Sequence, residues 1–194
     1  MNMNTVITSR EAILETCRSL IKEKGWDAVN IRSVAAACGV SVGSIYNYYS
    51  SKSDLIAATV ASVWFDIFYI KGSRTEASSF YEYISWIYHC MEEGEKKYPD
   101  FFTLHTVSLL GKEKEKGKEM MEQSWNHMKK GLLFVLEQDP HIRKEVFDSV
   151  FTAEKLVDMV FSLILASLLQ KEYDCSALLE AIRRSLYYKN DTEN

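Results

Sequence analysis

The chain has 194 residues, a formal net charge of −4 at pH 7, two prolines and eight glycines. So few helix breakers favour helix over sheet, and the length allows either one good core or a small domain joined to a larger one. The acidic balance argues against a protein that coats nucleic acid without sequence preference. Residues 1–55 differ slightly, because their basic side chains outnumber their acidic ones by one.

The four cysteines are scattered, with no CxxC pair and no histidine at zinc-site spacing: Cys17, Cys38, Cys90 and Cys175. Three of them fall on apolar helical faces, which predicts buried, reduced thiols, and we expect neither a metal nor a cofactor. The longest apolar runs, 59–70 and 156–169, each contain an aspartate and are shorter than the roughly 20 residues of a membrane span. Residues 1–4 are polar, so the sequence predicts a soluble cytoplasmic protein with no membrane partner.

The first predicted helix begins after Thr8 or Ser9, either of which can cap it, and ends at Gly25. Its apolar residues recur on one helical face: Ile13, Leu14, Cys17, Leu20 and Ile21. The opposite face is charged, which predicts an amphipathic helix over a small core.

Two short helices follow, separated by a glycine. The first has an apolar face formed by Ile31, Val34, Ala35 and Cys38. Gly39 can take the positive φ at which that helix must turn, and Ser41 can cap the second helix, whose inward residues would be Ile45 and Tyr49. This is a helix-turn-helix pattern, in which the second helix offers its N-terminal residues to DNA bases. An ordinary helical hairpin has the same outline, so the pattern alone leaves both interpretations open.

Spaced matches over a longer stretch favour the first interpretation. From Ile13 to about Ala58 the chain resembles the N-terminal domain of the TetR (tetracycline-repressor) family of transcriptional regulators. The matching residues are Ile13-Leu14, Gly25-Trp26, Val34-Ala35, Gly39-Val40-Ser41, Ile45-Tyr46-Asn47-Tyr48-Tyr49 and Lys52-x-Asp54-Leu55. Two positions depart from the usual family residues, Asn30 for Thr and Tyr49 for Phe, and each keeps its role as a cap or a core aromatic.

The resemblance and the side-chain chemistry together predict the DNA-binding residues, which are Arg32, Ser41, Val42, Gly43, Ser44, Tyr46, Asn47, Tyr48 and Lys52. Asn47 can make a bidentate contact with adenine, and serine or tyrosine hydroxyls can bond bases or phosphates. Family positions that touch the phosphate backbone correspond to Arg32, Tyr48 and Lys52. Val42 and Gly43 differ from many relatives, so no operator sequence is carried over.

The remaining chain reads as helical. A capping box at Ser51–Asp54 opens a helix from Lys52 towards Ile70, and residues 78–97 are apolar nearly all round, which is typical of an enclosed helix. A break at Pro99 precedes a short helix that begins at Asp100 or Thr103 and runs through Leu110. Residues 111–118 predict a solvated turn or helix start, and 120–137 an amphipathic helix.

The body is rich in aromatic and sulfur side chains. A stripe of this kind forms either a core or a pocket, and the resembling family keeps an effector cavity among these helices. For a small apolar or aromatic effector we therefore expect a pocket lined by Trp64, Phe68, Trp86, His89, Phe102, His105, Met121, Trp125 and Met128.

The last two predicted helices carry apolar stripes wider than a small core covers. Thr152 can cap the first, and Asp174 or Ser176 the second. In the resembling family this pair forms a four-helix bundle with a second subunit, which predicts a homodimer interface at Leu156, Val160, Leu163, Ile164, Ser167, Leu178, Leu179, Ile182 and Leu186. Packing within one subunit is the alternative.

Together these patterns predict an all-α protein with a three-helix helix-turn-helix DNA-binding domain, residues 1–52, and a helical effector-binding and dimerisation domain, residues 53–194. The expected function is ligand-responsive transcriptional control, with repression more common: a homodimer binds a palindromic operator in double-stranded DNA, and a small molecule releases it. A protein of the same fold that binds a ligand or partner but no longer DNA is the alternative. No catalytic constellation is present in the sequence, so an enzyme is not expected.

Overall fold

The computed structural model describes residues 8–68, 79–103 and 115–188; for 115–124 it describes the backbone only. Within these ranges every regular element is a helix, apart from an isolated antiparallel β-bridge between Ile142 and Tyr187. The predicted all-α class is thereby confirmed. None of the described helices is long and apolar enough to cross a membrane.

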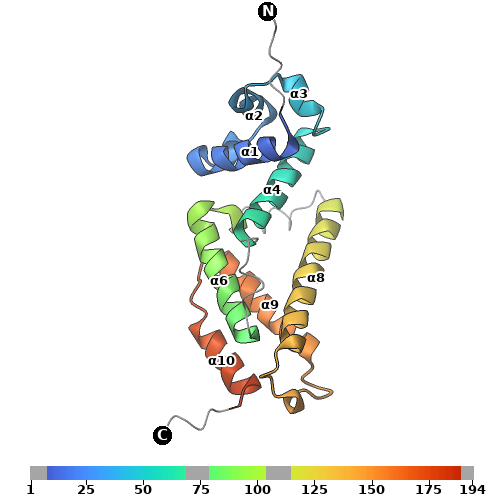
Figure 1. Cartoon of the computed structure of the whole chain (residues 1–194), viewed down its shortest axis with the longest axis vertical. Coiled ribbons are helices and arrows are strands. Elements are labelled where there is room, and N and C mark those ends of the chain that lie inside the picture. Colours follow the sequence, from blue (N-terminus) through green and yellow to red (C-terminus); the bar gives the residue numbers. More distant parts are fainter. Residues whose placement is uncertain (1–7, 69–78, 104–114, 189–194) are drawn as a thin grey trace, which may run out of the picture. The chain divides into compact units, whose positions relative to one another are not determined.

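The elements follow one another along the chain as Figure 1 shows, and their bounds are α1 (Arg10–Lys24), η1 (Trp26–Ala28), α2 (Ile31–Cys38), α3 (Val42–Tyr46), α4 (Lys52–Phe68), α6 (Phe80–Lys97), α8 (Glu115–Gln138), η2 (Lys144–Val146), α9 (Ala153–Gln170) and α10 (Ser176–Leu186). They fall into two compact units. The first contains Met1–Tyr69 together with Gly94–Pro99, and the second contains Ile70–Glu93 and Asp100–Asn194. Helix α6 therefore begins in one unit and ends in the other. The boundary predicted after residue 52 stays a prediction, although the packing groups α4 with the first unit.

The helices of the first unit begin and end at the capping residues that the sequence pattern predicts. The Ser9 side chain accepts from the Ala12 N–H at 3.1 Å and starts α1, while Gly25 ends it at φ 77°. The Asn30 side chain caps α2 by accepting from two backbone N–H groups, and Gly39 ends α2 in the left-handed region at φ 68°. Each of these side chains satisfies helix-end donors that would otherwise lack partners.

Helix α1 packs against α2 and α4, and α2 packs against α3. The apolar stripe predicted on α1 is buried except for Leu14, which is half-buried. The two residues predicted to point inward from α3, Ile45 and Tyr49, are 0% and 1% exposed. The face of α3 that carries Ile45 therefore packs on the core of the first unit, and the opposite face is exposed to solvent.

The second unit has a core shared by α6, α8, α9 and α10. Its most enclosed side chains come from all four helices and from the Phe101–Phe102 pair, and include Phe80, Ile84, Met91, Phe101, Phe102, Leu136, Val160, Ile182 and Leu186. Thr152 caps α9 as predicted, accepting from the Lys155 N–H. The cap of α10 differs from the prediction, because Cys175 takes the N-cap position without a side-chain bond. Asp174 instead accepts from the Ser176 N–H at 2.8 Å, one position further out.

Other predicted ends fall partly outside the described residues. Helix α4 is described as far as Phe68, so its predicted end at Ile70 lies outside them. The helix expected after Pro99 is helical at residues 101–103, and its continuation to Leu110 is likewise not described. Within the run 111–118, helix α8 already begins at Glu115, which agrees with the helix start rather than the turn.

Candidate DNA-binding surface and helical body

The N-terminus of α3 is presented to solvent by a short, well-capped turn. The Ser41 hydroxyl accepts from the Ser44 N–H at 3.1 Å and lies 2.9 Å from the Ser44 hydroxyl. Val42 is 40% exposed and Tyr46 50% exposed, both high values for large apolar side chains. Because Ile45 between them is fully buried, α3 has one face in the core and one face free for contact.

Gly43 lies on that free face, and the protomer gives no steric reason for a glycine there. An added Cβ would meet only the Ser41 hydroxyl oxygen, at 3.7 Å, which is ordinary contact. A glycine inside a helix lowers stability by roughly 0.5–1 kcal/mol relative to alanine. The packing of this chain therefore does not require a glycine at position 43.

Three cations lie in the first turns of the other helices of this unit. Arg32 lies in the first turn of α2 and Lys52 is the first residue of α4, and both are exposed. The capping box predicted before Lys52 is present, since the Asp54 N–H donates to Ser51 at 3.0 Å and Asp54 accepts from the Ser50 N–H at 2.9 Å. The Arg10 guanidinium, which sequence reasoning did not include, lies 5.1 Å from the Tyr49 ring centre.

Tyr48 has a structural role that the sequence did not reveal. Its hydroxyl donates to the Thr8 carbonyl at 2.5 Å, so it holds the residues before α1 against the turn that follows α3. Its neighbour Tyr49 donates in the same way to the Arg10 carbonyl at 3.5 Å. The half-buried Tyr48 hydroxyl keeps only its acceptor capacity for any further contact.

The residues predicted to line an effector pocket are spread over both units. In α4, Trp64 and Phe68 stack with ring centres 5.5 Å apart. In the second unit, Trp86 stacks on Tyr83 at 5.4 Å, and Trp125 meets Phe161 edge-on at 6.0 Å.

The other members of that set behave differently from one another. Phe102 is fully buried and Met128 half-buried, whereas His89 is exposed, because it lies on the outward side of α6. His105 lies outside the described residues, as does the side chain of Met121. A pocket lined by the whole set stays a prediction. The exposure of His89 argues against a pocket position for that residue.

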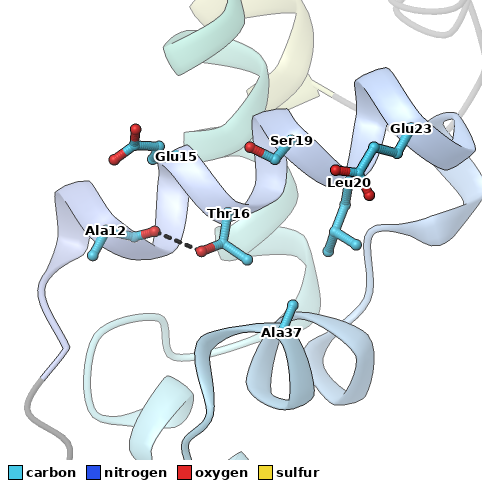
Figure 2. Close-up of a pocket in the computed structure, with 7 residues that line it drawn as sticks. All are labelled: Ala12, Glu15, Thr16, Ser19, Leu20, Glu23 and Ala37. Carbon is cyan, nitrogen blue, oxygen red and sulfur yellow. Dashed lines mark hydrogen bonds between the residues drawn. The ribbon is translucent and has the colours of Figure 1, made fainter.

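Two hollows can be seen among the described residues, and neither is lined by that set. The first, of about 440 Å³, lies between α1 and α2 and is lined by Ala12, Glu15, Thr16, Ser19, Leu20, Glu23 and Ala37 (Figure 2). Its charged side chains are both carboxylates, so it does not suit a phosphate. The second, of about 280 Å³, lies in the second unit and is lined by Leu136, Glu137, Asp139, Ile142, Lys144, Phe147 and Ala153.

The predicted dimer-interface residues lie mostly inside the protomer. Six of them are less than 9% exposed, namely Leu156, Val160, Ile164, Leu179, Ile182 and Leu186. Ser167 and Leu178 are half-buried, and the Ser167 hydroxyl lies 3.1 Å from that of Tyr88. Leu163, at 48%, is exposed. The apolar stripe of α9 and α10 thus packs within one subunit, while the outward face of α9 carries Met159, Leu163 and Leu169.

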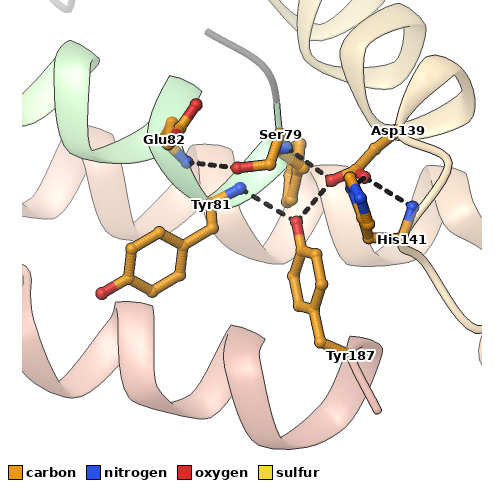
Figure 3. A network of polar contacts seen from close by, with 7 residues as sticks. Ser79, Tyr81, Glu82, Asp139, His141 and Tyr187 are labelled. Atoms are coloured by element: carbon orange, nitrogen blue, oxygen red, sulfur yellow. Dashed lines mark hydrogen bonds and ion pairs between the residues drawn. The ribbon is translucent and has the colours of Figure 1, made fainter. Parts of the chain in front are cut away.

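A buried carboxylate joins three chain segments of the second unit, as Figure 3 shows. The side chain of Asp139 is completely buried. One of its oxygens accepts from the Phe80 N–H at 2.8 Å and the Tyr187 hydroxyl at 2.5 Å. The other accepts from the His141 N–H at 2.9 Å. Sequence reasoning took Asp139-Pro140 only as the end of a helix, because its partners lie 48 and 59 residues away.

The electrostatics of this network favour the ionised acid. Burial alone would raise the pKa of Asp139, but the hydrogen bonds from Tyr187, Phe80 and His141 outweigh it and lower that pKa. The pKa of Tyr187 is raised by burial and by its bond to the carboxylate. A carboxylate at the start of α6 is also favoured by the helix dipole. No cluster of metal-ligating side chains is found in the described part of the chain.

The exposed helix α3 follows a glycine turn, as the second helix of a helix-turn-helix motif does. Comparisons with known proteins show which family this part of the chain resembles. Residues 13–59 match the profile of the family described as bacterial regulatory proteins, tetR family. The chain is 33% identical over 61 residues to the HTH-type transcriptional repressor KstR of Rhodococcus jostii (strain RHA1). That match spans 31% of this chain and 29% of the length of the relative. The N-terminal part of the chain, residues 13–59, thus matches the TetR family, which confirms the predicted resemblance.

Solved structures extend the similarity of fold to nearly the whole chain. The transcriptional regulator FadR from Bacillus subtilis, in complex with stearoyl-CoA, aligns with a TM-score of 0.58 and 18% identity, over 91% of this chain and 96% of that one. The fatty acid degradation regulator FadR from Bacillus halodurans aligns with a TM-score of 0.54 and 16% identity, over 92% and 95%. At these identities the likeness shows a shared fold.

Proposed function

We propose that this chain is a DNA-binding transcriptional repressor that binds a palindromic operator as a homodimer and is released by a small-molecule effector. The observation that carries the proposal is the free N-terminal face of α3. There, exposed Val42 and Tyr46 flank a glycine that the protomer does not require. Such a face can enter the major groove, where a Cβ at position 43 would otherwise meet the DNA.

The contacts divide by chemistry. Val42 offers an apolar surface suited to a thymine methyl group, while the exposed Asn47 can pair with an adenine edge. Arg32 and Lys52 lie at helix starts, where the helix dipole also favours phosphate. Tyr48 acts first by holding Thr8 and secondarily as a hydrogen-bond acceptor. We therefore assign base contacts to α3 and phosphate contacts to the two cations.

Dimerisation would use the outward face of α9. Met159 and Leu163 are 59% and 48% exposed, and Leu169 is 44% exposed. Three large exposed apolar side chains on the outward face of one helix are typical of an interaction surface. Two DNA-binding units related by a two-fold axis would then reach half-sites about 34–36 Å apart.

The effector is proposed to act on the body. The B. subtilis FadR structure, solved with stearoyl-CoA, makes long-chain acyl-CoA the first class to test, and an apolar or aromatic compound the second. Release requires only that the effector bind the DNA-incompetent state more tightly, by about 1–3 kcal/mol. Helix α6, which begins in the second unit and ends in the first, is continuous between them.

The test is selection of DNA from a random pool by the purified full chain, at two salt concentrations. We expect enrichment of a palindrome, and affinity that falls as salt rises. Tyr46→Ala should weaken operator binding by roughly ten- to a hundred-fold. Lys52→Ala should weaken binding to all DNA sequences about equally. It should also reduce the slope of log affinity against log salt concentration by about one.

Gly43→Ala gives a sharper separation of folding from DNA binding. The variant should be as stable as the wild type or more so, because Ala favours a helix and its Cβ has room. It should nevertheless bind the operator at least tenfold more weakly. If no DNA is enriched and Gly43→Ala changes stability alone, the chain is instead a ligand- or partner-binding protein of this fold.

A further inference from the structure

A second group of charged side chains lies in the first unit, away from α3. It consists of Arg18 and Lys22 on α1, Asp66 on α4, and Lys97 and Tyr98 from the end of α6, and we call it the cationic cluster. Lys52 and Asp66 are separated by 14 positions of α4, or about 21 Å along the helix. The cluster therefore lies far from the proposed DNA-binding face.

The cluster has more positive charge than its own carboxylate neutralises. Lys97 forms an ion pair with Asp66 at 2.6 Å, and the same oxygen accepts from the Tyr98 hydroxyl at 2.5 Å. Both partners therefore share one oxygen of Asp66, Oδ2. The Lys22 ammonium instead lies 5.2 Å from the centre of the Tyr98 ring, with no carboxylate partner among the described residues.

Arg18 has the same surplus of donors. Its guanidinium donates one hydrogen bond to the Ser62 hydroxyl. An arginine has five N–H donors, so it can donate further bonds. Glu15 is the other carboxylate whose charge reaches Lys22, and its effect is smaller than those of Lys97 and Asp66. Three cations thus face one engaged carboxylate and one more distant one.

The pKa of Lys22 reflects the positive electrostatic potential of the cluster. Its pKa is lowered, first by desolvation and then by the positive charge of Lys97, with Arg18 adding to the effect. The positive charges therefore repel one another across the cluster, and an added anion would relieve that repulsion. Tyr98 is fully buried, and it contacts both helices: its ring lies beneath Lys22 of α1, and its hydroxyl donates to Asp66 of α4.

We propose that Arg18, Lys22 and Lys97 form a binding site for the phosphate group of a small-molecule ligand. Arginine guanidinium and lysine ammonium groups are the usual partners of phosphate. Lys97 shares one oxygen of Asp66 with Tyr98, and no ion pair to a carboxylate is found for Arg18 or Lys22 among the described residues. The ligand's role as an effector rests on the proposed repressor function. Phosphate binding by itself does not depend on that function.

The experiment measures phosphate binding by calorimetry and by thermal unfolding, with the purified full chain and without DNA. Two probes distinguish a free ion from a phosphate carried by an organic ligand: inorganic phosphate and coenzyme A. We expect coenzyme A to bind and raise the Tm, and inorganic phosphate to compete for the same site. If neither probe binds at about 10 mM, the proposal is overturned.

Variants assign the site to these residues. Lys22→Met keeps the apolar stem over Tyr98, and Arg18→Gln keeps a donor for Ser62, so each removes charge with little change in packing. Each should weaken binding of the probe about tenfold. Lys24→Met, an exposed lysine two positions along α1, is the matched control and should bind like the wild type. Equal affinity in Lys22→Met, Arg18→Gln and the control would show that the phosphate binds elsewhere.

Operator binding separates this inference from the proposed function. Lys22→Met should bind selected DNA like the wild type, since it lies on the half of α1 away from Arg10 and Tyr49. If DNA binding is intact while coenzyme A binds all variants alike, the inference fails and the repressor stands. If no DNA is bound at all, the calorimetry still decides the phosphate site.

Discussion

The buried carboxylate of Asp139 gives the strongest stability prediction, because it accepts from the Phe80 N–H and the Tyr187 hydroxyl, 59 and 48 residues away in the sequence. Replacement by alanine would leave the Phe80 N–H and the Tyr187 hydroxyl without their acceptor, in a site where Phe80 is 0% exposed. An unsatisfied buried donor costs about 1–3 kcal/mol. We therefore expect Asp139→Ala to lower the free energy of unfolding by about 3 kcal/mol, which corresponds to a fall in Tm of roughly 6–12 °C for a chain of this size.

Asp139→Asn should be much milder. Its amide oxygen can keep the bonds from Phe80 and Tyr187, and only the bond from the His141 N–H is lost. The amide nitrogen would face the His141 N–H in place of an acceptor, and we expect the loss of this one bond to cost about 1 kcal/mol. Urea unfolding followed by circular dichroism measures all three proteins. If asparagine is as damaging as alanine, or alanine is harmless, the network does not hold these segments together.

The pH dependence of the same network has a definite sign. The pKa of Asp139 is lowered in the folded protein, so its contribution is complete above the unfolded pKa of about 3.9 and is lost as the pH falls through the folded pKa. Asp139→Asn has no carboxyl to titrate there. The difference in stability between wild type and Asp139→Asn should therefore narrow when the pH is lowered from about 6 to about 3, and a constant difference would contradict this account.

Three further changes test other parts of the structure. Gly39→Ala should lower the free energy of unfolding by about 1 kcal/mol through backbone strain at φ 68° alone, since nothing lies within 4 Å of an added Cβ; urea unfolding with no loss would show that the turn relaxes. Gly94→Ala would bring a Cβ to 2.9 Å from the Ile67 side chain, and we expect a net loss of about 1 kcal/mol. That loss should disappear in an Ile67→Ala background in a double-mutant cycle. Leu163→Glu should produce monomers in light scattering while the control Val150→Glu, 75% exposed, stays dimeric, and a dimeric Leu163→Glu would place the interface elsewhere.

Local sequence determined the helix-turn-helix part of the first unit almost completely. Its caps, its glycine turn and the inward positions of α3 depend on residues within about four positions of one another. Ser9, Asn30 and Ser41 satisfy N–H groups of the helix that follows each of them. Gly39 is required by a left-handed backbone conformation. Short-range chemistry of this kind is written in the sequence, and the exposed face of α3 follows from it.

Tertiary structure alone decided the features that depend on distant partners. The apolar periodicity of α9 and α10 was visible, but a stripe that faces the protomer's own core looks the same in sequence as one that faces a second subunit. Two partners of Asp139 lie at the ends of other helices, Phe80 at the start of α6 and Tyr187 just after α10. Lys22 and Tyr98 meet only when the end of α6 packs with α1 and α4. Tyr48 was assigned to DNA by resemblance, whereas its hydroxyl is held by Thr8, 40 residues earlier. Helical periodicity shows which face of a helix is apolar, and only the packed structure shows what covers that face.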